Sequence, residues 1–82
     1  MTAKLSKVMQ EGLKILFEKR KLYGDEFIHT IRVTEKTLWA LKERKFVEHS
    51  HSMAGAIYVD LWKLTDLGVL EAEKLVGAIN ED

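Results

Sequence analysis

The sequence predicts an α+β fold in which three helices are followed by a two-stranded hairpin and a last helix. Apolar residues recur at helical spacing over the first half of the chain. After Lys45 the pattern changes to that of two strands around a turn of small residues. A content of 46% hydrophobic residues, with five glycines and no proline, is typical of a chain that folds. We therefore expect the 82 residues to form one domain, residues 1–82, with the order α-α-α-β-β-α.

The first helix is expected at about residues 4–19. Polar residues fill the side opposite its apolar stripe, and basic residues at its end suit the negative pole of a helix. The apolar positions are Leu5, Val8, Met9, Leu13, Leu16 and Phe17.

A second, brief helix is expected at about residues 25–31. Gly24 interrupts the preceding pattern, and Asp25 can accept the first backbone N–H groups of a new helix. The apolar residues of this helix are Phe27, Ile28 and Ile31.

The third helix is expected at about residues 35–44, with Thr34 as its N-cap. Residues placed at intervals of about 100° put Leu38 and Leu41 on its inner side. The outer side then carries Glu35, Lys36, Trp39, Ala40 and Glu43.

Residues 46–51 (FVEHSH) and 56–64 (AIYVDLWKL) are expected to pair as a hairpin around the tip SMAG. Both runs are rich in the β-branched and aromatic residues that favour strands.

The last helix is expected at about residues 66–79, with Thr65 as its N-cap. Gly68 allows close approach of the backbone to the hairpin. The apolar stripe is Leu67, Leu70, Leu75 and Ile79.

Three segments resemble winged helix-turn-helix regulators of the PadR and MarR families. YGDEFIHTI, from Tyr23 to Ile31, resembles the stretch that opens the second helix of PadR-like proteins. RVTEKTL, from Arg32 to Leu38, is similar to the turn and N-cap of a recognition helix. WKLTDLG, from Trp62 to Gly68, resembles the entry from the second wing strand into the last helix. The resemblance implies a winged-helix fold and a transcriptional regulator that binds double-stranded DNA as a homodimer, laying its third helix in the major groove.

The resemblance also suggests which residues would contact DNA. Glu35 and Lys36 could read base edges, because glutamate can accept from cytosine and lysine can reach guanine. Phosphate contacts are expected from Arg32, Thr34 and Thr37, and from the basic run Lys19, Arg20 and Lys21.

The distribution of charge leaves a second interpretation open, a winged-helix module that docks on another protein through the third helix and wing. Thirteen Lys and Arg balance thirteen Asp and Glu, whereas DNA-binding domains are often strongly basic. The wing has no Lys or Arg between Lys45 and Lys63. Trp39 could pack on the wing or another helix, contact a protein partner or contact DNA.

The sequence indicates no catalytic residues, cofactor or metal site. It contains no phosphate-binding loop, nucleophile elbow or HExxH motif, so we do not expect an enzyme. His49 and His51 lie two apart beside Glu48 and near Asp60, but such spacing is common by chance.

We expect a soluble, cytoplasmic homodimer. The sequence has no cysteine and no apolar run long enough to span a membrane. A small domain often needs a second chain to complete its apolar burial. The residues expected at the dimer contact are Leu5, Val8, Met9, Leu75 and Ile79.

Overall fold

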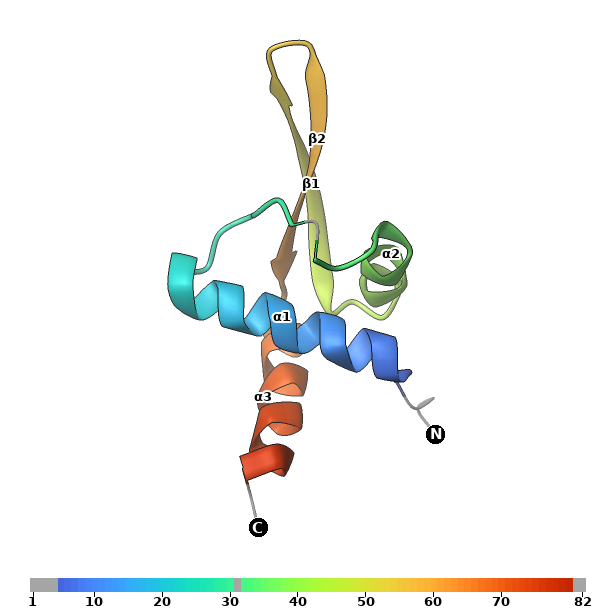
Figure 1. The fold of residues 1–82 in the computed structure, drawn as a ribbon, viewed down its shortest axis with the longest axis vertical. Helices are drawn as coiled ribbons and strands as arrows, with labels where there is room; N and C mark the ends of the chain where they lie inside the picture. The colour runs from blue at the N-terminus through green and yellow to red at the C-terminus, as the bar shows by residue number, and fades with distance from the viewer. Residues whose placement is uncertain (1–4, 31, 81–82) are drawn as a thin grey trace.

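The computed structural model describes residues 5–30 and 32–80. In this part of the chain the fold is α+β, with three helices and a two-stranded antiparallel hairpin. The order is α1 (Lys7–Tyr23), α2 (Glu35–Glu43), β1 (Val47–Ala54), β2 (Ile57–Leu64) and α3 (Asp66–Asn80). The hairpin and α3 extend to opposite sides of α1, which gives a molecule of 49 × 28 × 20 Å (Figure 1).

The helix predicted at residues 25–31 is wrong, and so is the order α-α-α-β-β-α. The described residues of this segment, 25–30, contain no helix, and Ile28 forms a bridge with β2 instead. Its N–H donates to the Trp62 carbonyl at 2.9 Å, and the Trp62 N–H donates to the Ile28 carbonyl at 2.8 Å. So short a helix gains few internal hydrogen bonds, so pairing with a sheet edge prevails over helical propensity. Ile31 lies outside the described residues.

Helix α1 begins and ends later than the predicted 4–19. Ser6 is its N-cap, with the Ser6 hydroxyl accepting from the Met9 N–H at 3.2 Å. The helix continues through Tyr23 and ends at Gly24, which has φ +90 and donates its N–H to the Arg20 carbonyl at 2.8 Å. Glycine adopts this conformation at low cost, so Gly24 rather than the basic run ends the helix.

Helix α2 begins directly after Thr34, whose hydroxyl accepts from the Thr37 N–H at 3.3 Å. It ends one residue earlier than predicted, at Glu43, and Lys45 follows with φ +67. The chain then turns sharply into β1, and the Phe46 N–H donates to the Leu41 carbonyl at 3.0 Å. The end of α2 is therefore joined closely to the start of the hairpin.

The hairpin has a shorter turn than the predicted tip SMAG. The register runs from Val47 opposite Leu64 to Ala54 opposite Ile57, so only Gly55 and Ala56 form the turn. Gly55 has φ +67, a conformation that two-residue hairpin turns require and glycine supplies. As a result β1 extends beyond the predicted 46–51.

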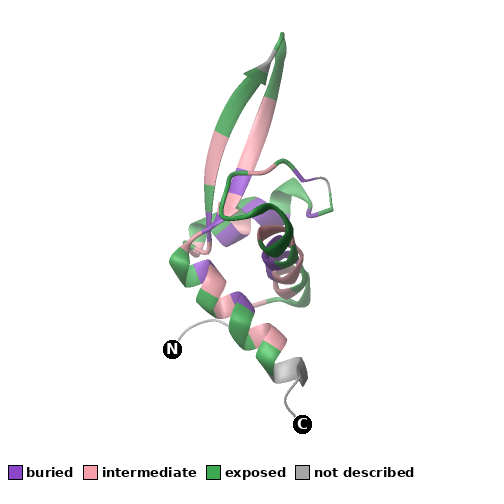
Figure 2. Ribbon diagram, turned by 90° about the vertical axis from the view of Figure 1, so that its left-hand side faces the viewer, coloured by how far each residue is buried: buried purple, intermediate pink, exposed green. Residues whose placement is uncertain are grey.

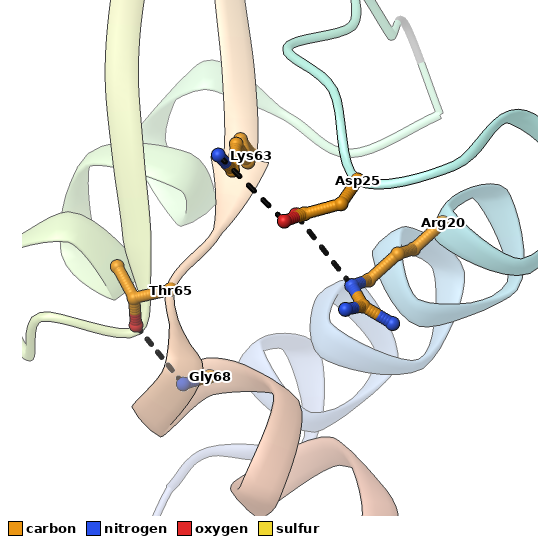
Figure 3. A network of polar contacts seen from close by, with 5 residues as sticks. All are labelled: Arg20, Asp25, Lys63, Thr65 and Gly68. Atoms are coloured by element: carbon orange, nitrogen blue, oxygen red, sulfur yellow. Dashed lines mark hydrogen bonds and ion pairs between the residues drawn. The ribbon is translucent and has the colours of Figure 1, made fainter.

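Helix α3 is capped by Thr65, whose hydroxyl accepts from the Gly68 N–H at 3.0 Å (Figure 3). The same hydroxyl donates to the Lys45 carbonyl at 2.7 Å, which links α3 to the start of the hairpin. A Cβ on Gly68 would overlap the carbonyl oxygen of Phe46. Gly68 is thus required by the close approach of α3 to the backbone before β1.

The core lies where α1 crosses α2, α3 and the base of the hairpin. Figure 2 shows buried residues gathered there, while the distal half of the hairpin is largely exposed. The buried apolar residues are Leu13, Leu16, Phe17, Val33, Leu38, Leu41, Val47, Trp62, Leu64 and Ala72.

Across residues 5–30 and 32–80, no helix combines the length and the apolar character that a membrane span requires.

Candidate interaction surface

Five of the eight residues predicted to contact DNA, Arg32 and Thr34–Thr37, lie in α2 or just before it. Arg32, Glu35 and Lys36 are exposed near the start of the helix. Thr37 has only 7% of its surface exposed, and its hydroxyl accepts from the Thr34 hydroxyl at 2.9 Å. Because the side chain faces the core, Thr37 offers little surface for the phosphate contact that was predicted for it. Thr34 itself is occupied as the N-cap of α2.

The predicted phosphate-binding run of Lys19, Arg20 and Lys21 lies away from α2. Helix α1 meets α2 at Gly12, where an added Cβ would be 3.3 Å from the Thr37 side chain. At 1.5 Å per residue, the run begins about 10 Å farther along the α1 axis. The structure therefore does not bring the basic run and the exposed face of α2 together.

The three residues of the basic run contact their own neighbourhood. The Lys19 ammonium lies 5.8 Å from the Tyr23 ring centre, and that of Lys21 lies 4.9 Å from the Phe17 ring centre. The Arg20 Nε lies 3.6 Å from the Asp25 carboxylate, an ion pair longer than a hydrogen bond. The contacts of all three side chains are therefore with the last turns of α1 and the segment directly after it.

Asp25 was predicted to cap a helix, but it instead bridges two elements. Its carboxylate lies between Arg20 of α1 and the Lys63 ammonium of β2, 3.8 Å away (Figure 3). Together with the Ile28 bridge, these ion pairs fix the segment after α1 against the hairpin. Asp25 is about half exposed, so screening by water keeps each ion pair weak.

Trp39 joins α2 to the hairpin. Its ring centre lies 4.8 Å from that of His49 and 5.0 Å from that of Trp62, which it meets edge-on at 85°. Such edge-to-face contacts are favourable between aromatic rings. Trp39 nevertheless keeps 41% of its surface exposed. The expected packing on the wing is therefore present, and a large part of the ring remains available to a partner.

The aromatic contacts continue along one face of the hairpin toward its tip. His51 stacks on Tyr58, with ring centres 5.1 Å apart and planes 18° from parallel. We call the residues Trp39, Trp62, His49, His51 and Tyr58 the aromatic row. Because it crosses from α2 to the hairpin, it forms one continuous surface feature.

His49 also pairs with a carboxylate on the neighbouring strand. Its Nε2 lies 2.8 Å from the Asp60 Oδ1, and both side chains are partly buried. The part of the chain that the structure describes contains no group of three or more His, Asp or Glu side chains that could hold a metal ion.

The tip of the hairpin is apolar and exposed. Met53, Ile57 and Tyr58 each have more than half of their surface exposed, and neither strand carries a lysine or arginine except Lys63 at its base. The hairpin cannot therefore attract phosphate groups by charge. Met53 and Tyr58 lie opposite each other on one face, and Ile57 lies on the other face. Exposed apolar groups that lie together are typical of contacts with another molecule.

The sequence interpretation placed Asp60 near His49 but did not predict their pairing, and it did not identify the stacking of His51 on Tyr58. The hairpin register contained this information. A two-residue turn at Gly55 places His49 opposite Trp62 and His51 opposite Asp60. His49 and Asp60, and likewise His51 and Tyr58, are then diagonal neighbours on the same face. The longer tip SMAG left that register undetermined.

Comparison of the chain with protein-family models, with characterised proteins and with solved structures finds no match.

Proposed function

We propose that the chain is a winged-helix domain that docks on another protein through the outer face of α2 and the hairpin. The fold assignment is supported by α2 leading directly into a hairpin, by a helix capped at Thr65 after it, and by the resemblance of WKLTDLG to PadR and MarR proteins. It departs from those families because no helix lies between α1 and α2 in the described residues. A winged helix can serve as a protein-docking module as well as a DNA reader.

The observation that carries this function is the apolar character of the surface formed by the aromatic row and the hairpin tip. Partly exposed Trp39 lies at one end, and Met53 and Tyr58, which are opposite each other on the same face of the hairpin and are exposed, lie at the other. Aromatic residues and methionine are enriched in protein interfaces, whereas charged residues are depleted at their centres. Trp39 has the properties of an interface anchor, being large, held by neighbouring rings and still accessible.

The charges of α2 support the same function. The exposed charged residues of this helix are two acids and two bases, Glu35, Lys36, Lys42 and Glu43. Binding to the DNA backbone requires several phosphates to be neutralised at once. The basic run on α1 begins about 10 Å farther along that helix from the contact with α2, so it is not part of this surface.

DNA binding by α2 is the second candidate, and the position of Lys36 favours it. Lys36 is exposed in the first turn of α2 beside Glu35, and Arg32 is exposed just before the helix. Side chains near the start of a recognition helix are the ones that reach base edges in the major groove. A regulator of this kind would use two α2 helices on a palindromic site.

We further propose that the chain forms a homodimer through α1 and α3. Val8 of α1 and Leu67 and Leu70 of α3 are each at least half exposed. Burying such side chains against a second copy would stabilise both chains. Among the residues expected at this contact, Leu5, Met9 and Leu75 pack partly on the chain's own core, and the side chain of Ile79 lies outside the described residues.

Two measurements on the same set of variants test these functions. In affinity capture with the intact chain, a protein partner should be retained by the wild type and by Lys36→Ala, but lost on Trp39→Ala and on Met53→Ser. A desolvated aromatic anchor commonly contributes about 2 kcal/mol or more to affinity.

Titration with mixed-sequence duplex DNA at increasing salt tests the second candidate, DNA binding. DNA binding should show a log–log slope of about −0.9 per neutralised phosphate, and Lys36→Ala should weaken specific binding by about 1–3 kcal/mol. That outcome, without a partner that depends on Trp39, would contradict protein docking and support the second candidate.

A further inference from the structure

A groove lies beside the outer edge of β2, between the hairpin and the segment that leads into α2. Its volume is about 430 Å³, within the range of about 300–1,000 Å³ that is typical of ligand sites. His29, Thr30 and Val33–Glu35 form one side, and Ile57–Asp60 of β2 form the other. Leu38 and Trp62, both buried, also line it. The groove thus combines an apolar lining with an adjacent strand edge.

The edge of β2 beside this groove offers backbone groups to a further strand. Ile28 pairs with Trp62 on this edge, through both backbone hydrogen bonds. In an antiparallel strand, every second residue directs its N–H and C=O to the same side, so Asp60 and Tyr58 face the same edge as Trp62. Among the residues that the structure describes, the bridge at Ile28 is the one rung on this edge. The Asp60 carbonyl on this edge already lies 3.4 Å from the His29 Nδ1, so an extended chain placed beyond the bridge would pair mainly at Tyr58.

The charged groups of the groove indicate the chemistry of such a chain. Glu35, exposed in the first turn of α2, and Asp60 of β2 line the groove, and neither lysine nor arginine does. The Asp60 carboxylate already pairs with His49, so Glu35 is the acid best placed to receive a cation from a partner. Val59 and Ile57 supply apolar contact on the strand side.

We propose that this groove binds an extended, basic segment of a partner protein as an added strand along β2. The backbone of the segment pairs with the β2 edge at Tyr58, its apolar side chains contact the groove lining, and a lysine or arginine pairs with Glu35. Strand addition gives affinity through main-chain hydrogen bonds and specificity through alternate side chains. This inference rests on the proposed protein-docking function and adds the chemistry of the partner.

The probe is a blocked peptide of about eight residues in which valine alternates with lysine. One control peptide has glutamate in place of lysine, and another has the valine–lysine sequence with alternate backbone nitrogens methylated. Binding is measured by tryptophan fluorescence, because Trp62 lines the groove, and by backbone amide NMR shifts. The valine–lysine peptide should bind and shift the amides of Tyr58, Asp60 and Glu35, and both controls should bind at least about tenfold more weakly.

Matched charge reversals on α2 test whether the lysine of the peptide pairs with Glu35. Glu35→Lys should weaken the peptide by about tenfold or more, and Glu35→Gln, a milder change, should weaken it less. Glu43→Lys makes the same charge change at the far end of α2, which does not line the groove, and should leave affinity within about twofold. Equal effects of the two reversals, equal binding of the glutamate peptide or equal binding of the methylated peptide would overturn the proposal.

Met53→Ser separates this inference from the proposed function. Met53 is exposed on β1 and does not line the groove, so this variant should keep the peptide while losing the captured protein. Capture of a Trp39-dependent partner, together with no binding of the valine–lysine peptide, would refute the groove and leave the docking function standing.

Discussion

Replacing Thr65 by alanine should destabilise the fold, because one hydroxyl holds the start of α3 to the start of the hairpin. The Thr65 hydroxyl accepts from the Gly68 N–H at 3.0 Å and donates to the Lys45 carbonyl at 2.7 Å. Loss of an N-cap costs about 0.5–2 kcal/mol. A hydrogen bond adds about 0.5–1.5 kcal/mol, and the bond to Lys45 is exposed, which favours the lower value. We expect Thr65→Ala to lower the free energy of unfolding by about 1–3 kcal/mol.

Urea denaturation measures this change as a shift of the midpoint at constant slope. In a thermal scan, each kcal/mol should lower the melting temperature by about 4–8 °C for a domain of this size. Thr65→Ser is the matched control, since it keeps the hydroxyl and should retain most of the stability. The reasoning would be refuted if the serine variant lost as much stability as the alanine variant, or if Thr65→Ala changed stability by less than about 0.3 kcal/mol.

Four further predictions concern other contacts. Gly68→Ala should cost about 2 kcal/mol or more in urea denaturation, because the new methyl group overlaps the Phe46 carbonyl; stability equal to that of the wild type would contradict the close approach. Trp39→Ala should cost about 1–3 kcal/mol by the same assay, since a partly exposed ring loses contacts with two others. Asp25→Ala should cost less than about 1 kcal/mol, because both ion pairs are screened. Leu70→Glu should convert the proposed dimer into a monomer in sedimentation equilibrium, and a wild type that is monomeric at high micromolar concentration would contradict the dimer.

The elements predicted from the sequence depend on signals that act within a few residues. Thr34 and Thr65 are N-caps because a threonine hydroxyl can satisfy a free N–H three residues later, whatever the rest of the fold does. The inner side of α2 likewise follows from helical spacing, and Leu38 and Leu41 are buried. Helical spacing also indicates the position of Thr37, which lies only about 40° from Leu41 around the helix. Its assignment as a phosphate contact followed the family resemblance instead.

Residues 25–31 could not be assigned correctly from local signals. Gly24, Asp25 and the following apolar residues are compatible with a capped helix, and the sequence alone does not show that β2 passes close by. In the structure Ile28 gains two backbone hydrogen bonds from Trp62, which lies more than thirty residues later. Pairing over such a sequence distance depends on the tertiary fold, so it outweighs a weak local preference. The same limit applies to Asp25, which bridges α1 and β2.

The joint between α2 and the hairpin, formed by residues 44–46 and the contacts of Trp39, sets the position of α2 relative to the hairpin. Helix α2 ends at Glu43 and β1 begins at Val47, and the link between them is held by the bond from Phe46 to the Leu41 carbonyl and by the bond from Thr65 to the Phe46 carbonyl. Packing of Trp39 on His49 and Trp62 fixes the same two elements at a second place.

Two attachments, one at the link between α2 and β1 and one at Trp39, hold α2 against the base of the hairpin, so the exposed part of Trp39 keeps its place beside the aromatic row. Binding of a partner to Trp39 and the aromatic row together therefore costs this chain little conformational entropy. Preorganisation of this kind increases affinity without added contact area. A partner that contacts only one of the two gains no such advantage. Under the proposed docking function, the joint would therefore favour a partner whose surface matches the arrangement of Trp39 and the aromatic row.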